Sequence, residues 1–149
     1  MTRTIYLDMD GTIANLYEVQ GWLNDLVNHN ERPYAEAKVM WNMSLLARLL
    51  NIVQKRGYNI GIISWLSKNS TVEYDEKVTK VKKEWLNRHL KSVTFDFIHI
   101  VEYGTPKSLF ANSNDILFDD EEQNRQDFIG TAYDATQLIT VLKQLTSTL

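Results

Sequence analysis

The chain has 149 residues, of which 44% are apolar and 23% are charged, and its net charge is −3. This length suits one domain with a sizeable core. The absence of cysteine excludes a disulfide framework and a thiolate metal site. The three histidines are scattered, which argues against a histidine-based zinc centre. The small negative charge gives no reason to expect duplex nucleic acid as a partner.

The apolar residues do not form a segment that suits a membrane. No apolar run approaches the roughly 18 residues that a membrane-spanning helix needs. The N-terminus leads directly into a short strand and then into acids, which is unlike a signal peptide. We therefore expect a cytoplasmic protein without a membrane partner, present as a monomer or a homodimer.

The first half of the chain predicts short strands and helices in alternation. Its expected elements are a strand over 4–7, a helix over 16–26, an ambiguous stretch over 34–42, a helix over 45–56 and a strand over 58–64. The first helix rests on apolar residues three or four apart, namely Leu16, Val19, Leu23 and Leu26. Pro33 disfavours helix at the residue before it and ends this region. Gly57 ends the second helix.

The second half continues the alternation. Its expected elements are a polar loop over 65–74, a helix over 73–90, a strand over 95–101, a short helical segment over 107–110, strands over 115–118 and 130–133, and a final helix. Asp134 caps that last helix, with Gln137 three residues later as in a capping box. Strands separated by helices pair in parallel through right-handed crossovers. We therefore predict an α/β fold of three layers, with a parallel sheet between helices.

Polar residues follow the predicted strands at the points where the strands end. In an open parallel sheet, ligands bind beyond the carboxyl ends of the strands. Lys68 and Lys91 are competing lysines, but only Lys107 follows the third strand and a Gly-Thr-Pro turn. The groups expected at this edge are Asp8 and Asp10, Ser64, Lys107, and the pair Asp119 and Asp120.

Acids, a hydroxyl and an ammonium at one sheet edge suit phosphoryl transfer. Carboxylate oxygens without histidine or cysteine favour Mg²⁺. We predict that Asp8 attacks phosphorus directly and forms an aspartyl-phosphate. Asp10, two residues later, is predicted to protonate the leaving oxygen and then to take a proton from the hydrolytic water.

The oxygens of the transferred phosphate need hydrogen-bond donors and positive charge. We expect Ser64 to donate a hydrogen bond to one of them and Lys107 to offset the remaining negative charge. Backbone N–H groups in the turn over residues 8–11 supply further donors. Met9 and Trp65, the neighbours of the nucleophile and of the serine, therefore complete the predicted phosphate-binding set.

Several aromatic residues lie in or beside the segment between the first two strands. Tyr34 and Trp41 are the candidate substrate contacts, because a nucleobase that stacks on an aromatic ring gains roughly 1–3 kcal/mol. Trp22 and Trp65 share this setting. The alternative is that these rings pack a small cap against the core.

The acidic stretch after the first strand carries a family resemblance. Residues 8–12, Asp-Met-Asp-Gly-Thr, resemble the first motif of the haloacid dehalogenase superfamily of phosphohydrolases. Ser64, Lys107 and the pair at 119–120 are similar to its second, third and fourth motifs, in the same order. The resemblance covers essentially the whole chain.

This resemblance implies a Rossmann-like core with the sheet order 5-4-1-2-3 and a Mg²⁺-dependent aspartate nucleophile. It implies that Asp10 binds the metal through its backbone oxygen. Of the acidic pair, Asp120 matches the family's metal ligand better, and Asp119 is the supporting acid.

Within the superfamily, the chain is most similar to the 5'(3')-deoxyribonucleotidase-like branch. The shared features are an insertion between the first two motifs and an acidic pair in the fourth. Residues 14–58 are expected to form a small cap-type insertion within one domain over 1–149. Substrate choice in this superfamily lies mostly in the cap, so a short cap leaves the substrate open.

The expected function is that of a Mg²⁺-dependent phosphomonoesterase acting on (deoxy)nucleoside monophosphates. One alternative keeps the reaction but changes the substrate to a polynucleotide 3'-phosphate or another small phosphate ester. A second alternative is a phosphate- or metal-binding module of the same fold that does not catalyse.

Overall fold

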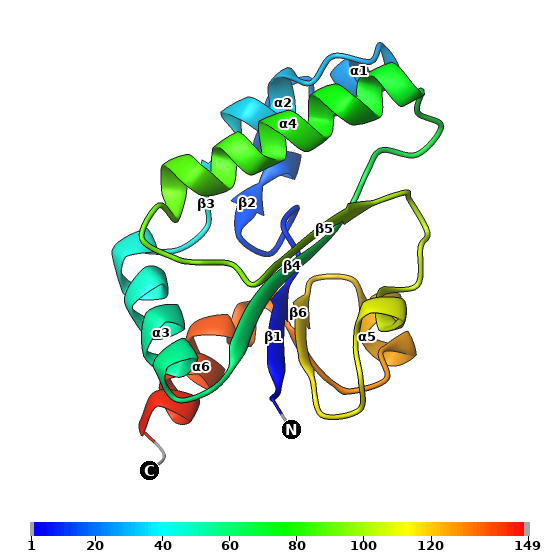
Figure 1. Cartoon of the computed structure of the whole chain (residues 1–149). Coiled ribbons are helices and arrows are strands. Elements are labelled where there is room, and N and C mark those ends of the chain that lie inside the picture. Colours follow the sequence, from blue (N-terminus) through cyan, green and yellow to red (C-terminus); the bar gives the residue numbers. More distant parts are fainter. Residues whose placement is uncertain (1, 148–149) are drawn as a thin grey trace.

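Five parallel strands form the central sheet of the structure, a computed structural model that describes residues 2–147 (Figure 1). Within that range, no helix combines the length and apolar character needed to cross a membrane. The elements are β1 (Thr4–Leu7), β2 (Ala14–Asn15), η1 (Leu16–Glu18), α1 (Trp22–Val27), α2 (Arg32–Glu36), β3 (Lys38–Val39), α3 (Met43–Lys55), β4 (Asn59–Trp65), α4 (Val72–His89), β5 (Phe97–Val101), η2 (Lys107–Phe110), β6 (Ile116–Asp119), α5 (Glu122–Asp127), β7 (Thr131–Asp134), η3 (Ala135–Gln137) and α6 (Leu138–Ser147).

The order of the strands places β1 in the middle of the sheet. The sheet runs β5-β4-β1-β6-β7, and every neighbouring pair is parallel. Numbered one to five along the chain and taken from the β7 edge, these strands follow the order 5-4-1-2-3. The predicted three-layer α/β fold with this sheet order is therefore confirmed.

The main core lies between the sheet and two helices. Because side chains alternate across a strand, Ile5 and Leu7 point to one face of β1 and Tyr6 to the other. The first face is covered by α3 and α6, which lie side by side (Figure 1). On the second face, Tyr6 packs with Leu117 and Phe128 in a smaller cluster.

The segment from β2 to β3 lies with α4 on the side of the carboxyl edge (Figure 1). β2 and β3 pair in antiparallel, and α2 packs against α4. Leu16, Tyr34 and Val78 belong to the cluster that joins these parts. The rest of the predicted 14–58 insertion includes α3, which packs against α6 in the core layer.

Three local predictions differ from the structure. The single helix over 16–26 is instead η1 and α1, because Gly21 between them adopts a left-handed φ of 77° that a helix cannot contain. Pro33 does not end the first helical region: α1 ends at Val27, shortly before His29 with its positive φ of 56°, and Arg32 is the first residue of α2. Pro33 lies in the first turn of α2, where its missing N–H costs no hydrogen bond. The helix α5 was not predicted, since its sequence carries no apolar stripe.

Candidate active site

Asp8 lies at the centre of the carboxyl edge, immediately after β1. Its side chain is largely enclosed, and the residue is 7% exposed. Its backbone N–H donates to the Phe118 carbonyl at 3.0 Å, which ties the start of the turn to β6. Its Oδ1 accepts from Lys107 Nζ at 2.9 Å, and its Oδ2 accepts from Thr12 Oγ1 at 3.2 Å. Both carboxylate oxygens are therefore held in place.

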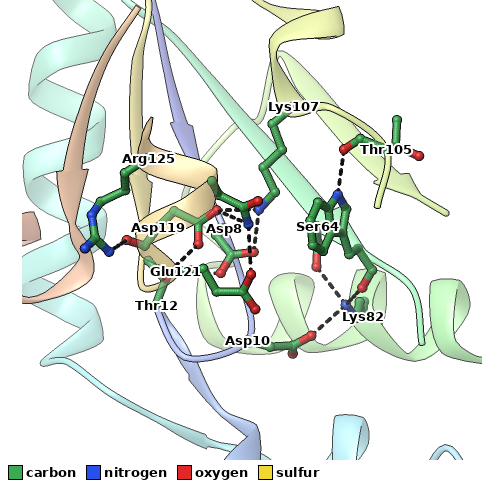
Figure 2. Close-up of polar contacts among 12 residues, drawn as sticks. Asp8, Asp10, Thr12, Ser64, Lys82, Thr105, Lys107, Asp119, Glu121 and Arg125 are labelled. Atoms are coloured by element: carbon green, nitrogen blue, oxygen red, sulfur yellow. Dashed lines mark hydrogen bonds and ion pairs between the residues drawn. The ribbon is translucent and has the colours of Figure 1, made fainter. Parts of the chain in front are cut away.

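Lys107 bridges two buried acids, as Figure 2 shows. Its ammonium lies 2.9 Å from Asp8 Oδ1 and 2.7 Å from Asp119 Oδ2. It also lies 5.5 Å from the centre of the Trp65 ring. Burial alone would lower the pKa of Lys107, but the two carboxylates outweigh it and raise that pKa above its usual range. The lysine is therefore a permanent cation at this edge.

Three carboxylates crowd the same place. One oxygen from each of Asp8, Asp119 and Asp120 lies within 4.8 Å of the other two. Burial and the charge of Asp8 raise the pKa of Asp119, and the same causes raise the pKa of Asp120 to about 8. The protein alone therefore compensates this negative charge incompletely.

The two acids of the pair differ in what they already contact. Asp119 accepts three hydrogen bonds: its Oδ1 accepts from the Glu121 N–H at 3.0 Å, and its Oδ2 accepts from Lys107 and from Asn124 Nδ2 at 3.1 Å. Asp120 instead lies against Gly11, where a Cβ would be 2.2 Å from its Oδ2. The left-handed φ of 83° at Gly11 and this contact both demand glycine.

The chemistry of this cluster fits a hard divalent cation. It offers carboxylate oxygens only, without nitrogen or sulfur ligands, which is the donor set that Mg²⁺ prefers. A cation there would also neutralise the crowded carboxylates. Asp119 already accepts three hydrogen bonds and Asp8 accepts two, so Asp8 and Asp120 are the members with more acceptor capacity left.

Lys82 is the functional candidate that the sequence reasoning missed. It comes from α4, far along the chain, yet it is only 1% exposed. Its ammonium donates to Asp10 Oδ2 at 2.9 Å, to Ser64 Oγ at 2.7 Å and to the Trp65 carbonyl at 2.8 Å (Figure 2). A signal was present in the sequence, because Lys82 interrupts the apolar stripe of α4 between Val78 and Trp85. A lysine at a core-facing helical position calls for a buried partner.

A cavity of about 480 Å³ opens beside these groups. Its acidic end contains Asp8, Asp10, Asp119, Asp120 and Glu121. The rest of the wall is largely apolar and aromatic. Two aromatic pairs stand out, since the rings of Tyr17 and Trp22 meet edge to face at 5.0 Å and those of Trp65 and Tyr103 also lie 5.0 Å apart.

The remaining predicted residues take different positions around the cavity. Tyr34 lines it and pairs its hydroxyl with Ser67 Oγ at 2.7 Å. Trp41 packs against the main core and donates from Nε1 to the Thr12 carbonyl at 2.7 Å, so it does not belong to the described wall. Trp65 lines the wall and donates from Nε1 to the Thr105 carbonyl at 2.8 Å.

Two further predicted residues, Ser64 and Met9, are buried and do not line the described cavity. Ser64 is fully buried at the end of β4 and accepts the Lys82 hydrogen bond. The side chain of Met9 is in the core, and its carbonyl accepts from the N–H groups of Thr12, Ile13 and Ala14. In the predicted phosphate turn, the N–H of Gly11 already donates to the Ala14 carbonyl at 2.9 Å.

Comparison with known proteins supports the architecture. No family model and no curated protein matches the sequence. Among solved structures, the chain resembles the D,D-heptose 1,7-bisphosphate phosphatase from Burkholderia thailandensis, with a TM-score of 0.59 and 12% identity. The match covers 99% of this chain and 100% of that one. The two proteins share a fold. At this level of identity, the similarity concerns the fold alone.

Proposed function

We propose that the chain is a Mg²⁺-dependent phosphomonoesterase of the haloacid dehalogenase superfamily that acts through an aspartyl-phosphate on Asp8. The observation that carries this proposal is the bridge from Lys107 to Asp8 and Asp119, with Asp120 beside it, at the centre of the sheet edge. Three separate segments of the chain, at the ends of β1 and β6 and at the start of η2, converge there. Such a set has no evident structural purpose, because a cluster of buried acids destabilises a fold.

Asp8 is the proposed nucleophile. One of its oxygens forms a bond to phosphorus while the bond from phosphorus to the leaving oxygen breaks. Asp10, which lines the same cavity, gives a proton to that leaving oxygen. In the second half of the reaction, Asp10 takes a proton from a water that attacks phosphorus. Inorganic phosphate is released and the Asp8 carboxylate is restored.

The proposed metal ligands are Asp8, Asp120 and the backbone oxygen of Asp10. Asp119 supports the site by orienting Lys107, since its carboxylate already accepts three hydrogen bonds, one more than that of Asp8. When bound, Mg²⁺ supplies positive charge next to the phosphoryl oxygens. Lys107 adds a fixed positive charge in direct contact with the nucleophile.

Phosphate binding is assigned to Ser64, Lys107 and backbone N–H groups at Met9 and Trp65. Ser64 accepts from Lys82, which leaves its hydroxyl proton free to donate. Because Ser64 is fully buried and does not line the described cavity, this donation requires the phosphate to reach the end of β4. Lys107 offsets the added negative charge.

The proposed substrate is a (deoxy)nucleoside monophosphate, as in the 5'(3')-deoxyribonucleotidase-like branch. A cavity of about 480 Å³ suits one mononucleotide. Its two aromatic pairs offer flat apolar faces on which a base can stack. The wall residues from η1 to α2 belong to the part of the 14–58 segment that precedes α3, which we take as the small cap. Trp22 therefore replaces Trp41 as the contact we favour there.

A substrate panel with purified protein tests this function. We expect Mg²⁺-dependent release of phosphate from nucleoside monophosphates, with a higher kcat/KM than for sugar phosphates or 3'-phosphorylated oligonucleotides. Preference for the oligonucleotides would transfer the assignment to a polynucleotide 3'-phosphatase. Binding of Mg²⁺ and phosphate without any turnover across the panel would instead support a non-catalytic module.

A further inference from the structure

Lys82 is the most buried cation in the described part of the chain. Its three donated hydrogen bonds use every ammonium hydrogen. Its ammonium also lies 4.9 Å from the centre of the Tyr34 ring. These contacts fix the Lys82 ammonium in one orientation.

The partners of Lys82 indicate why a charge is buried there. A lysine on the apolar stripe of α4 is costly, and an apolar residue of similar size would stabilise the helix packing as well. Two of its partners, Asp10 and Ser64, are side chains that the proposed reaction uses. Lys107 holds the nucleophile, and Lys82 separately holds the proton carrier, so the two lysines contact different acids.

The contact is made to one oxygen of Asp10 only. Lys82 engages Oδ2, and the Asp10 side chain remains 16% exposed where it lines the cavity. The other oxygen is therefore left to face a substrate. Without Lys82, the side chain of Asp10, which lies in the turn after β1, would lose the contact that selects one of its staggered rotamers.

We propose that Lys82 is a positioning residue, which fixes the carboxyl of Asp10 so that its proton reaches the leaving oxygen. This inference rests on the proposed phosphatase function. In the step concerned, the bond between phosphorus and the leaving oxygen breaks as the Asp10 proton moves to that oxygen. An alkoxide leaving group needs this proton, whereas p-nitrophenolate is stable enough to leave without it.

Two substrates that differ in the leaving group therefore test the proposal. In Lys82→Met, we expect kcat/KM for a nucleoside monophosphate to fall by roughly 10²-fold, the lower end of what a general acid contributes. The fall for p-nitrophenyl phosphate should be under about fivefold, because its leaving group needs little protonation. Lys82→Arg keeps a donor toward Asp10 and should recover part of the loss on the nucleotide only. Lys83→Met, an exposed neighbour on α4, is the matched control and should change neither value.

A double variant keeps the test decisive if Lys82→Met folds poorly. Asp10→Asn with Lys82→Met removes both charges, so no unpaired ion is left in the core. If Lys82 acts through Asp10, this double variant should retain the same nucleotide kcat/KM as Asp10→Asn alone. A further loss in the double variant, or equal losses on both esters in Lys82→Met, would overturn the proposal. A wild-type protein that hydrolyses neither ester would remove the phosphatase function itself and this inference with it.

Discussion

The carboxylate of Asp120 lies directly against the backbone of Gly11: a Cβ at residue 11 would stand 2.2 Å from Asp120 Oδ2. The contact joins the turn after β1 to the end of β6, so two distant parts of the chain share one small space. Any side chain at residue 11 must displace the acid that we propose as a metal ligand.

Gly11→Ala should therefore impair metal binding beyond its effect on stability. We expect the Mg²⁺ concentration for half-maximal activity to rise at least tenfold, about 1.4 kcal/mol of lost binding. Gly57→Ala is the matched control, since Gly57 also has a left-handed φ, 104°, but nothing within 4 Å of an added Cβ. The Gly57→Ala substitution should lower the free energy of unfolding by only about 1–2 kcal/mol, through backbone strain. Equal Mg²⁺ requirements in the two variants would contradict the proposed role of Asp120.

Removal of the Asp8 carboxylate should abolish turnover without harming the fold. Asparagine keeps the shape of Asp8 and can still accept from Lys107, but it cannot form an acyl phosphate. Phosphate release by Asp8→Asn should fall below detection in a nucleotide assay. Its melting temperature in EDTA should match or exceed that of the wild type, because one of three crowded acids loses its charge. If Asp8→Asn still released phosphate at the wild-type rate, the covalent mechanism would be excluded.

Lys107 should matter for stability as well as for activity. Lys107→Met leaves Asp8 and Asp119 buried without their shared cation, and such a loss costs about 3–5 kcal/mol. Urea unfolding in EDTA measures this change. Lys91→Met, at an exposed lysine, provides the comparison and should stay within about 0.5 kcal/mol of the wild type. A Lys107→Met protein as stable as the wild type would mean that the bridge does not compensate these acids.

Mg²⁺ should stabilise the folded protein through Asp120. A cation that binds only the native state at a hundred times its Kd adds about 2.7 kcal/mol to the free energy of unfolding. We expect thermal unfolding to shift upward with Mg²⁺ in the wild type and in Asp127→Asn, whose carboxylate bonds only to Gln123 at the surface. In Asp120→Asn, the shift should largely disappear. An undiminished shift would place the cation elsewhere.

Trp22 should contribute to the recognition of the base. Trp22→Leu keeps an apolar side chain beside Tyr17 but removes the flat indole face. We expect KM for a nucleoside monophosphate to rise by roughly 5- to 150-fold, which corresponds to the 1–3 kcal/mol of one stacked base. The KM for β-glycerophosphate, which has no ring, should stay the same in this variant. A parallel rise for both substrates would indicate a general disturbance of the cap.

Much of the site was predictable because parallel strands end at one edge of a sheet. Asp8 and Lys107 are 99 residues apart, and yet their expected meeting rests only on chain order and strand pattern. The helix over 16–26 was predicted wrongly, because the spacing of apolar residues carries no information on the left-handed backbone angle of Gly21.

By itself, the sequence determined the α/β class, the order of the strands and the residues at their carboxyl ends, since these follow from periodicity and connectivity. Only the tertiary structure decided how those residues pair. It gives Asp119 three hydrogen bonds and leaves Asp120 against Gly11, it places Trp41 outside the cavity wall, and it brings Lys82 to Asp10. The physical reason is that a buried contact depends on the direction of each side chain and on the packing of α4 over the sheet edge. Neither of these is encoded in spacing along the chain.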